Sequence, residues 1–303
     1  MAQPYMLVPG QGSSQADEWI KLGLDAQMSG KLHDAQRHYQ NALRLDPRHA
    51  IATQNLAIVF AQSNLMNEAL LTIERASMMD GVHGVIQMNW ALMAMEADRI
   101  DDALKAARKS VEMAPNAQSR LALAMVLGTA GLPDEALPLY EAMLKEEPKH
   151  AAAGPNSCFL QTLTTATPED LRRQREIWYQ ANRYTGAVAP HSNNRSKDRP
   201  LRVGYVSGDF KRHSAAMIFG AVVFNHTAKI ERYLYSTLAV DPVADTVSKK
   251  FKDLGNWHDI STLDDEKADS LIRSNGIDIL VDLARHTNGG RLPLFTRRPA
   301  PIQ

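Results

Sequence analysis

The chain has 303 residues, of which 44% are apolar, and its 34 basic residues balance 34 acidic ones. This length accommodates two ordinary domains, and the balanced charge gives no general attraction to nucleic acid or to an anionic membrane. The single cysteine, Cys158, excludes a disulfide within the chain, and no signal peptide or apolar run of about 18 residues is present, so we expect a cytoplasmic protein.

Residues 1–15 show no helical or strand pattern, and we expect an N-terminal tail there. A repeat follows over residues 16–150. Alanines recur at intervals of 34, 34 and 33 residues, each with a turn-forming residue five positions before it and a helix-ending residue twelve positions after it. The three series are Ala35, Ala69, Ala103 and Ala136; Gly30, Asn64, Asp98 and Gly131; and Pro47, Gly81, Pro115 and Pro148.

Three series in one register predict a helix–turn–helix unit repeated four times. Two antiparallel helices joined by a short turn approach closely near that turn, and a small side chain such as alanine permits the approach. The period and pattern resemble the tetratricopeptide repeat (TPR) family, and Gly23 and Tyr39 of the first repeat also fit it. Such arrays bury their faces against neighbouring repeats and form extended concave binding surfaces.

Two asparagines occupy equivalent positions in neighbouring repeats. Asn55 and Asn89 lie 34 residues apart, each just before an apolar residue and an alanine of its first helix. The family resemblance implies that this position lines the concave face, where an amide can both donate to and accept from a peptide backbone. We therefore predict that Asn55 and Asn89 bind an acceptor peptide, although asparagine can also occur at this position without such a role.

Residues 151–200 keep some helical character but lose the repeat. Thr167 reads as a helix N-cap, with Pro168 at the first helical position and two acidic residues in the first turn. The stretch from Thr185 to Pro200 is rich in Gly, Pro, Ser and Asn, which predicts a linker or an exposed loop.

From residue 201 strands and helices alternate, which predicts a parallel sheet covered by helices on both faces. The order resembles half of a doubly wound, Rossmann-like domain. The expected strands are 201–207, 233–240, 258–260 and 277–283, and the expected helices are 214–228, 246–254 and 264–274.

Two basic loops follow the first and last of these strands. One runs from Ser207 to Ser214 and the other from Ala284 to Arg291, and each holds one histidine, His213 or His286. Since ligands of open parallel sheets lie outside the carboxyl ends of the strands, the two loops predict a polar cleft with an anionic ligand nearby. No zinc-ligand spacing, Walker loop or nucleophile elbow is present.

Three segments in this order resemble the protein O-GlcNAc transferase and SPINDLY family. They are Arg202 to Phe210 followed by His213-Ser214, Gly276 to Leu283 followed by His286-Thr287, and Arg298 to Gln303. Arg175-Glu176-Ile177-Trp178 also resembles the segment that joins the repeats to the catalytic region in that family. The resemblance implies a metal-independent, inverting glycosyltransferase with the two-lobed GT-B fold, of which residues 201–303 would form the N-terminal lobe.

The family resemblance also implies roles for particular residues. A transferase of this kind moves N-acetylglucosamine (GlcNAc) from UDP-GlcNAc to Ser or Thr of proteins, while the repeats hold the acceptor. His213 is the candidate catalytic base, since an imidazole of near-neutral pKa can accept a hydroxyl proton. The candidate substrate-binding residues are Asp209, Ser214, His286 and Thr287.

Two features depart from the family pattern. Arg285 stands where the family usually has glycine, so a tight turn or close ligand approach is in question. The family continues past the motif that ends here at Gln303, so we expect a truncated chain that is inactive alone. Two alternatives stay open: a TPR interaction scaffold with a non-catalytic α/β remnant, and a protein O-fucosyltransferase.

Overall fold

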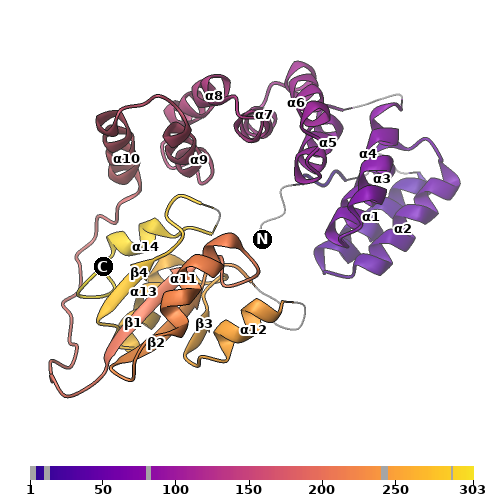
Figure 1. Cartoon of the computed structure of the whole chain (residues 1–303). Helices are drawn as coiled ribbons and strands as arrows, with labels where there is room; N and C mark the ends of the chain where they lie inside the picture. Colours follow the sequence, from indigo (N-terminus) through magenta and orange to yellow (C-terminus); the bar gives the residue numbers. More distant parts are fainter. Residues whose placement is uncertain (1–4, 10–13, 80–82, 240–244, 288) are drawn as a thin grey trace. The chain divides into compact units, whose positions relative to one another are not determined.

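The structure is a computed structural model, and it describes residues 5–9, 14–79, 83–239, 245–287 and 289–303. Contacts within the chain define two compact units that meet in sequence at Glu147 and Pro148. The first unit is helical, and the second contains a connector and a parallel sheet (Figure 1). The predicted fold class, a TPR array followed by a Rossmann-like α/β region, is confirmed.

The repeat unit consists of four helical pairs. In chain order the helices are α1 (Gln15–Met28), α2 (Leu32–Leu45), α3 (Ala50–Gln62), α4 (Met66–Ser77), α5 (Gly84–Glu96), α6 (Ile100–Met113), α7 (Ala117–Thr129) and α8 (Pro133–Glu146). The four repeated alanines, Ala35, Ala69, Ala103 and Ala136, are fully buried. At Gly23 an added Cβ would lie 2.5 Å from the Tyr39 ring, which explains why glycine stands there.

The turn within each helical pair uses a left-handed residue. Gly30 and Gly131 have φ of 74° and 73°, and Asn64 and Asp98 both have φ of 60°. Glycine adopts this region without steric cost, and asparagine and aspartate enter it more readily than other residues. The predicted series of turn formers is therefore confirmed, whereas Gly81, one of the predicted helix-ending residues, lies outside the described residues.

The N-terminal region differs from a free tail. Tyr5 is only 9% exposed and belongs to the largest hydrophobic cluster of the repeat unit, against which Leu7 also packs. The backbone of residues 6 and 8 contacts side chains of α3 and α5. These contacts were not predicted, because their partners lie 47–91 residues away in sequence.

The second unit begins with the connector, which holds α9 (Ala153–Leu160), a 3-10 turn η1 (Gln161–Leu163) and α10 (Pro168–Asn182). Thr167 caps α10 as predicted: its side chain accepts from the Asp170 N–H, and the Asp170 carboxylate accepts from the Thr167 N–H. Cys158 is buried in α9, and burial raises the pKa of its thiol to about 11.

Within the described residues the sheet has four parallel strands in the order β3-β2-β1-β4. The strands are β1 (Leu201–Ser207), β2 (Ile230–Ser236), β3 (Trp257–Asp259) and β4 (Ile279–Asp282). The helices are α11 (Ser214–Phe224), α12 (Thr246–Lys252), α13 (Asp265–Ser274) and α14 (Leu292–Thr296). Alternate residues of β1 face different clusters: Val203 and Tyr205 join residues of α11 and α12, whereas Val206 joins residues of α13 and α14.

Some predicted element bounds were wrong. Strand β2 starts at Ile230 rather than Tyr233, because Ile230 pairs with Leu201 at the start of β1. Its predicted end, Val240, lies outside the described residues. Helix α11 ends at Phe224, four residues before the predicted end. Pairing with a strand far away in sequence decides where a strand begins, and local pattern does not report it.

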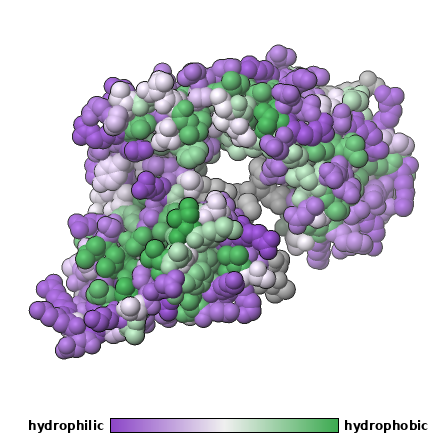
Figure 2. Space-filling model, in the orientation of Figure 1, coloured by the Kyte–Doolittle hydropathy of each residue, from purple (hydrophilic) through white to green (hydrophobic). Residues whose placement is uncertain are grey.

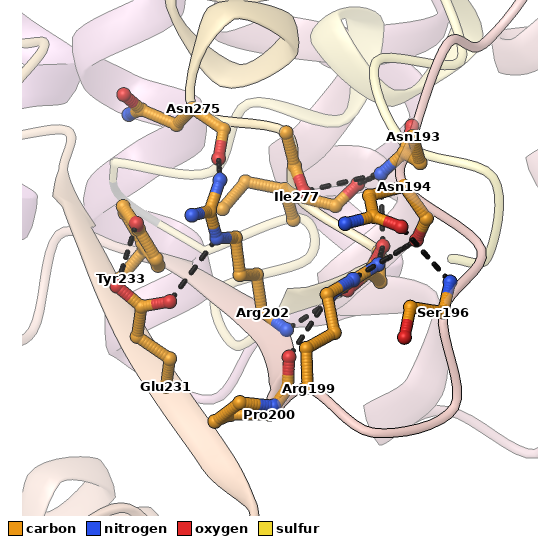
Figure 3. A network of polar contacts seen from close by, with 12 residues as sticks. Asn193, Asn194, Ser196, Arg199, Pro200, Arg202, Glu231, Tyr233, Asn275 and Ile277 are labelled. Carbon is orange, nitrogen blue, oxygen red and sulfur yellow. Dashed lines mark hydrogen bonds and ion pairs between the residues drawn. The ribbon is translucent and has the colours of Figure 1, made fainter.

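The predicted linker is attached to Asp278, the residue before β4, and Figure 3 shows Arg199 of the linker close to Arg202 of β1. Arg199 donates two hydrogen bonds to the Asp278 carboxylate, and Asn193 donates a third at 2.9 Å. Beside them, the Arg202 backbone N–H donates to the same carboxylate at 2.9 Å, and its guanidinium donates to Glu231 at 3.1 Å. These hydrogen bonds lower the pKa of Asp278 to about 2, with the Arg199 contact as the largest cause.

Helix α11 has an exposed apolar face. Met217, Ile218 and Val222 are 74%, 78% and 58% exposed. Figure 2 shows hydrophobic residues gathered over this helix. Within the described part of the chain, no helix has both the length and the apolar character needed to cross a bilayer.

Candidate functional site

The carboxyl ends of β1 and β4 lie next to each other. These two strands pair in parallel, with Val206 beside Asp282, while the other edge of β1 pairs with β2. The chain therefore leaves β1 and β4 at the same end of the sheet, the end formed by the carboxyl ends of the strands; we call this end the sheet edge. The strand order changes direction between β1 and β4, and doubly wound sheets bind ligands at such a point. This arrangement confirms that both predicted loops follow one sheet edge.

Two glycines bring the loops into contact. A Cβ added to Gly208 would lie 3.2 Å from the Gly289 Cα, and one added to Gly289 would lie 3.1 Å from the Gly208 Cα. The loop after β2 joins them, since the Thr237 hydroxyl donates to the Gly289 carbonyl at 2.6 Å. The loops after three strands thus meet in one small area at the carboxyl ends of the strands.

The first loop holds Asp209 and His213 close together. The carboxylate Oδ2 of Asp209 lies 3.7 Å from the His213 Nδ1, and Asp209 is only 8% exposed. His213 is the N-cap of α11, where its Nδ1 accepts from the Ala215 N–H at 3.2 Å. Its side chain is 47% exposed and therefore accessible to a ligand, and the neighbouring Ser214 is exposed as well.

The two Nδ1 neighbours of His213 favour different tautomers of the neutral ring. When Nδ1 accepts from the Ala215 N–H, the neutral ring carries its proton on Nε2, and Nε2 can only donate. When Nδ1 carries the proton, it faces the Asp209 carboxylate, and Nε2 is free to accept a proton. The site can therefore present either a donor or a proton acceptor at Nε2: the Ala215 hydrogen bond favours the donor, and the Asp209 carboxylate favours the acceptor.

The second loop is fixed by Asp282 at the end of β4. Its carboxylate accepts from the N–H groups of Ala284 at 3.1 Å and Arg285 at 2.9 Å. Arg285 has φ of 51°, in the left-handed region where glycine is favoured. The turn forms with arginine in place, so the departure from the family pattern puts a residue with a side chain into a strained backbone conformation.

His286 lies in a more enclosed environment than His213. Its ring meets the Trp178 ring of α10 edge-on, with centroids 4.9 Å apart. Burial, and then the charges of Arg175 and Arg285, lower the pKa of His286, so its imidazole is neutral at pH 7. Its Nδ1 is buried without a hydrogen-bond partner among the described residues, which leaves one polar atom for a ligand to satisfy.

Thr287 has a structural contact of its own. Its hydroxyl donates to the Ala284 carbonyl at 2.5 Å, and its N–H donates to the same carbonyl at 3.0 Å. The side chain is exposed, so it remains within reach of solvent and of a ligand. The next residue of the predicted loop, Asn288, lies outside the described residues.

Asn55 and Asn89 lie in the other unit, on α3 and α5, and both are fully buried. Each amide pairs with the backbone of the N-terminal segment: Asn89 with Met6 and Asn55 with Val8. Their role toward an acceptor peptide stays a prediction. Among the described residues, no group of three or more His, Cys, Asp or Glu side chains is arranged to hold a metal ion.

Sequence reasoning missed three residues that shape the sheet-edge site: Asp282, Thr237 and Trp178. A signal existed for Asp282, since an acidic residue at a strand end often accepts from the backbone two or three residues later. Trp178 was noted only as part of a family segment, and its contact with His286, 108 positions away, has no local signal. The Trp178–His286 contact thus brings together two of the segments that resemble the family.

Comparison with known proteins agrees with the division seen in the structure. Residues 184–303 match the model of glycosyl transferase family 41, and residues 20–77 and 88–153 match a tetratricopeptide repeat model. A probable UDP-N-acetylglucosamine–peptide N-acetylglucosaminyltransferase SPINDLY from Oryza sativa subsp. japonica is 32% identical over 174 residues, which are 54% of this chain and 18% of that protein. Its namesake from Hordeum vulgare is 38% identical over 117 residues, 37% of this chain and 12% of that protein.

A solved structure extends the likeness across both units. A mutant O-GlcNAc transferase from Thermobaculum terrenum has a TM-score of 0.57 and 22% identity, and the match covers 96% of this chain and 51% of that one. At this identity the likeness shows the fold. The chain spans less than a fifth of the length of the plant relatives it matches. Together, the repeats, the match of residues 184–303 to glycosyl transferase family 41 and the two loops at the carboxyl ends of the strands make this chain similar, over the matched stretches, to the SPINDLY and O-GlcNAc transferases.

Proposed function

We propose that this chain, together with a second α/β lobe that completes the cleft, transfers GlcNAc from UDP-GlcNAc to Ser or Thr hydroxyl groups of proteins. The observation that carries the proposal is the sheet edge where the Asp209–His213 pair and the His286 loop meet, inside the segment that matches glycosyl transferase family 41. The relatives named as peptide N-acetylglucosaminyltransferases supply the substrate class. The single cysteine suits a cytoplasmic location.

In the proposed reaction the acceptor hydroxyl oxygen attacks the anomeric carbon of the sugar while the bond to UDP breaks, and the configuration inverts. The hydroxyl proton passes to the His213 Nε2 in the state whose Nδ1–H faces Asp209. The imidazolium that results is stabilised by the nearby carboxylate. Ser214, His286 and Thr287 are proposed to contact the donor or the acceptor from the same edge.

The proposal assigns the repeat unit to acceptor binding and includes no metal ion. Asn55 and Asn89 supply amides that pair with backbone groups, and backbone pairing suits acceptors of many different sequences. Metal independence is tested by adding EDTA, which leaves the transfer rate unchanged if the proposal is right.

The test offers radiolabelled UDP-GlcNAc and GDP-fucose in parallel to the protein with its second lobe and to a set of protein acceptors. GlcNAc incorporation supports the proposal. Incorporation of fucose alone contradicts it and establishes the O-fucosyltransferase alternative. Binding of acceptors without any sugar transfer establishes the scaffold alternative, which the pairing of both asparagines with backbone groups of the chain's own N-terminal segment also supports.

These 303 residues alone are expected to bind UDP-GlcNAc weakly. A GT-B site forms between two lobes, and the chain has one parallel sheet within its described residues. Calorimetry could give a dissociation constant near 1 μM or tighter, about −8 kcal/mol. That result would place a complete nucleotide site within this chain and contradict the proposal that the site needs both lobes.

A further inference from the structure

Two backbone positions of the N-terminal segment pair with two asparagines of the repeats. The Asn89 Oδ1 accepts from the Met6 N–H at 2.9 Å, and its Nδ2 donates to the Met6 carbonyl at 2.8 Å. One repeat earlier, the Asn55 Oδ1 accepts from the Val8 N–H at 3.4 Å, and its Nδ2 donates to the Val8 carbonyl at 2.9 Å. Each amide thus makes the same pair of contacts, 34 residues apart.

This pattern identifies the conformation and direction of the segment. The N–H and C=O of one residue point to the same side only in an extended chain, and the next residue on that side is two positions away. Met6 and Val8 fulfil this spacing. The segment runs opposite to the order of the repeats, from α5 to α3 (Figure 1).

The alternate side chains contact the hydrophobic core of the array. Tyr5 is 9% exposed within the largest cluster, and its hydroxyl donates to Glu96, while Leu7 packs against the same cluster. Met6 between them is 39% exposed. The surface that receives the segment, which we name the asparagine face, consists of Gln54, Asn55, Asn89 and Glu96.

We propose that Tyr5–Val8 is a tethered occupant of the asparagine face, and that an external extended peptide with an aromatic and an aliphatic residue two positions apart must displace it. The inference rests on the proposed function only in naming that external peptide a glycosylation acceptor. The segment shows what the face selects: backbone groups of two alternate residues, and apolar side chains at the positions between them.

The tether makes the occupant an effective competitor. Only five residues separate Val8 from Ser14, the N-cap of α1, and a short tether gives an effective concentration on the order of 1 mM. If the free segment bound with a dissociation constant of about 100 μM, the tethered one would weaken external peptides by roughly tenfold. The array would then respond only to acceptors that bind more tightly than its own N-terminus.

The experiment measures binding of a fluorescent peptide with the sequence of residues 3–9, by anisotropy, to the 303-residue chain. The variant Met6→Pro with Val8→Pro removes both N–H groups that the asparagines accept from. The matched control, Met6→Ala with Val8→Ala, keeps them. The peptide is expected to bind the proline variant about tenfold more tightly than the wild-type chain or the alanine control. Equal affinities for the proline and alanine variants overturn the proposal.

Two further measurements test whether the peptide binds at the asparagine face and whether it displaces the N-terminal segment. Adding Asn89→Ala to the proline variant is expected to abolish peptide binding, and unchanged binding would place the peptide elsewhere and overturn the proposal. If the proline variant does not fold, hydrogen exchange on the wild-type chain replaces it. Exchange at Met6 and Val8 should rise when peptide is added in millimolar excess, and unchanged exchange contradicts displacement. None of these readouts involves sugar transfer, so a failure of the proposed enzymatic function leaves them unaffected.

Discussion

The repeat unit and the α/β unit each present a set of polar side chains, but they hold them in different ways. Asn55 and Asn89 project from helices, are fully buried, and have both amide groups paired with backbone. His213 and His286 belong to loops after strands, one 47% exposed and the other with an unpaired Nδ1 among the described residues. Rigid, paired amides suit recognition of a constant backbone, whereas partly open histidines suit a ligand that exchanges protons.

The largest effect is expected at His213 in the protein with both lobes. His213→Ala should lower sugar transfer by about 100-fold or more, since a positioned proton acceptor typically contributes roughly 10²–10⁴ in rate. Its ring is 47% exposed, so the melting temperature should fall only by the few degrees that the loss of one helix cap costs. Turnover and melting temperature are measured together on His213→Ala and His286→Ala.

The paired variants separate the two loops. Near-normal turnover of His213→Ala would remove the catalytic assignment. Impairment of His286→Ala alone would transfer the role to the second loop, whose histidine is neutral at pH 7. Asp209→Asn sharpens the result further. It should shift the pH profile of transfer if Asp209 stabilises the imidazolium, and leave it unshifted if His213 acts only as a donor.

The next largest effect concerns the glycine contact between the loops. Gly289→Ala must place a Cβ 3.1 Å from three neighbouring atoms with φ of 80°, so it should destabilise the α/β unit by about 2–3 kcal/mol. The matched control is Gly255→Ala, where φ is 79° and no atom lies within 4 Å. Its cost should be about 1 kcal/mol, from the backbone alone. Urea denaturation of both variants measures the difference, and equal costs would show that the loops separate freely.

The difference between the units also explains how much of each could be predicted. In the repeat unit the same local rule occurs four times, so the turn residues Gly30, Asn64, Asp98 and Gly131 were identified from sequence and all adopt positive φ. In the α/β unit the elements through β4 and their order were predicted, but helix α14 was not. The start of β2 was not predicted either, because pairing with Leu201 decides it.

In the candidate site, too, some features could be predicted from the sequence and others could not. The position of both loops at one sheet edge could be predicted from the order of strands and helices, because the carboxyl ends of parallel strands lie at the same end of a doubly wound sheet. The partners of the histidines did not follow, since Trp178 reaches His286 from α10. Residues 5–8 were expected to be part of a tail, because a short apolar run without a repeat partner carries no signal of what it contacts.

A smaller effect is expected from acid at Asp278, which joins the linker to the sheet. Its pKa is lowered from 3.8 to about 2, mainly by Arg199, so the stability it contributes is present above about pH 4 and is lost as pH falls toward 2. With allowance for solvent screening the contribution should be about 1–2 kcal/mol. Hydrogen exchange in β1 and β4, compared between wild type and Asp278→Asn at pH 3 and pH 6, measures it. The two proteins should differ more at pH 6, and an equal difference at both values would contradict the linkage.

The smallest effect compares left-handed residues in the two units. Arg285 and Asn64 have φ of 51° and 60°, but arginine lacks the short polar side chain that eases asparagine into this region. Arg285→Gly should therefore stabilise the α/β unit by about 0.5–1 kcal/mol, since relief of strain exceeds the entropy that glycine adds to the unfolded chain. Asn64→Gly should change the stability of the repeat unit by only a few tenths of a kcal/mol. Denaturant unfolding of each variant measures both values. Because the Asp282 contact uses the backbone N–H of residue 285, glycine keeps it, and a loss of stability would mean that the arginine side chain itself supports the loop.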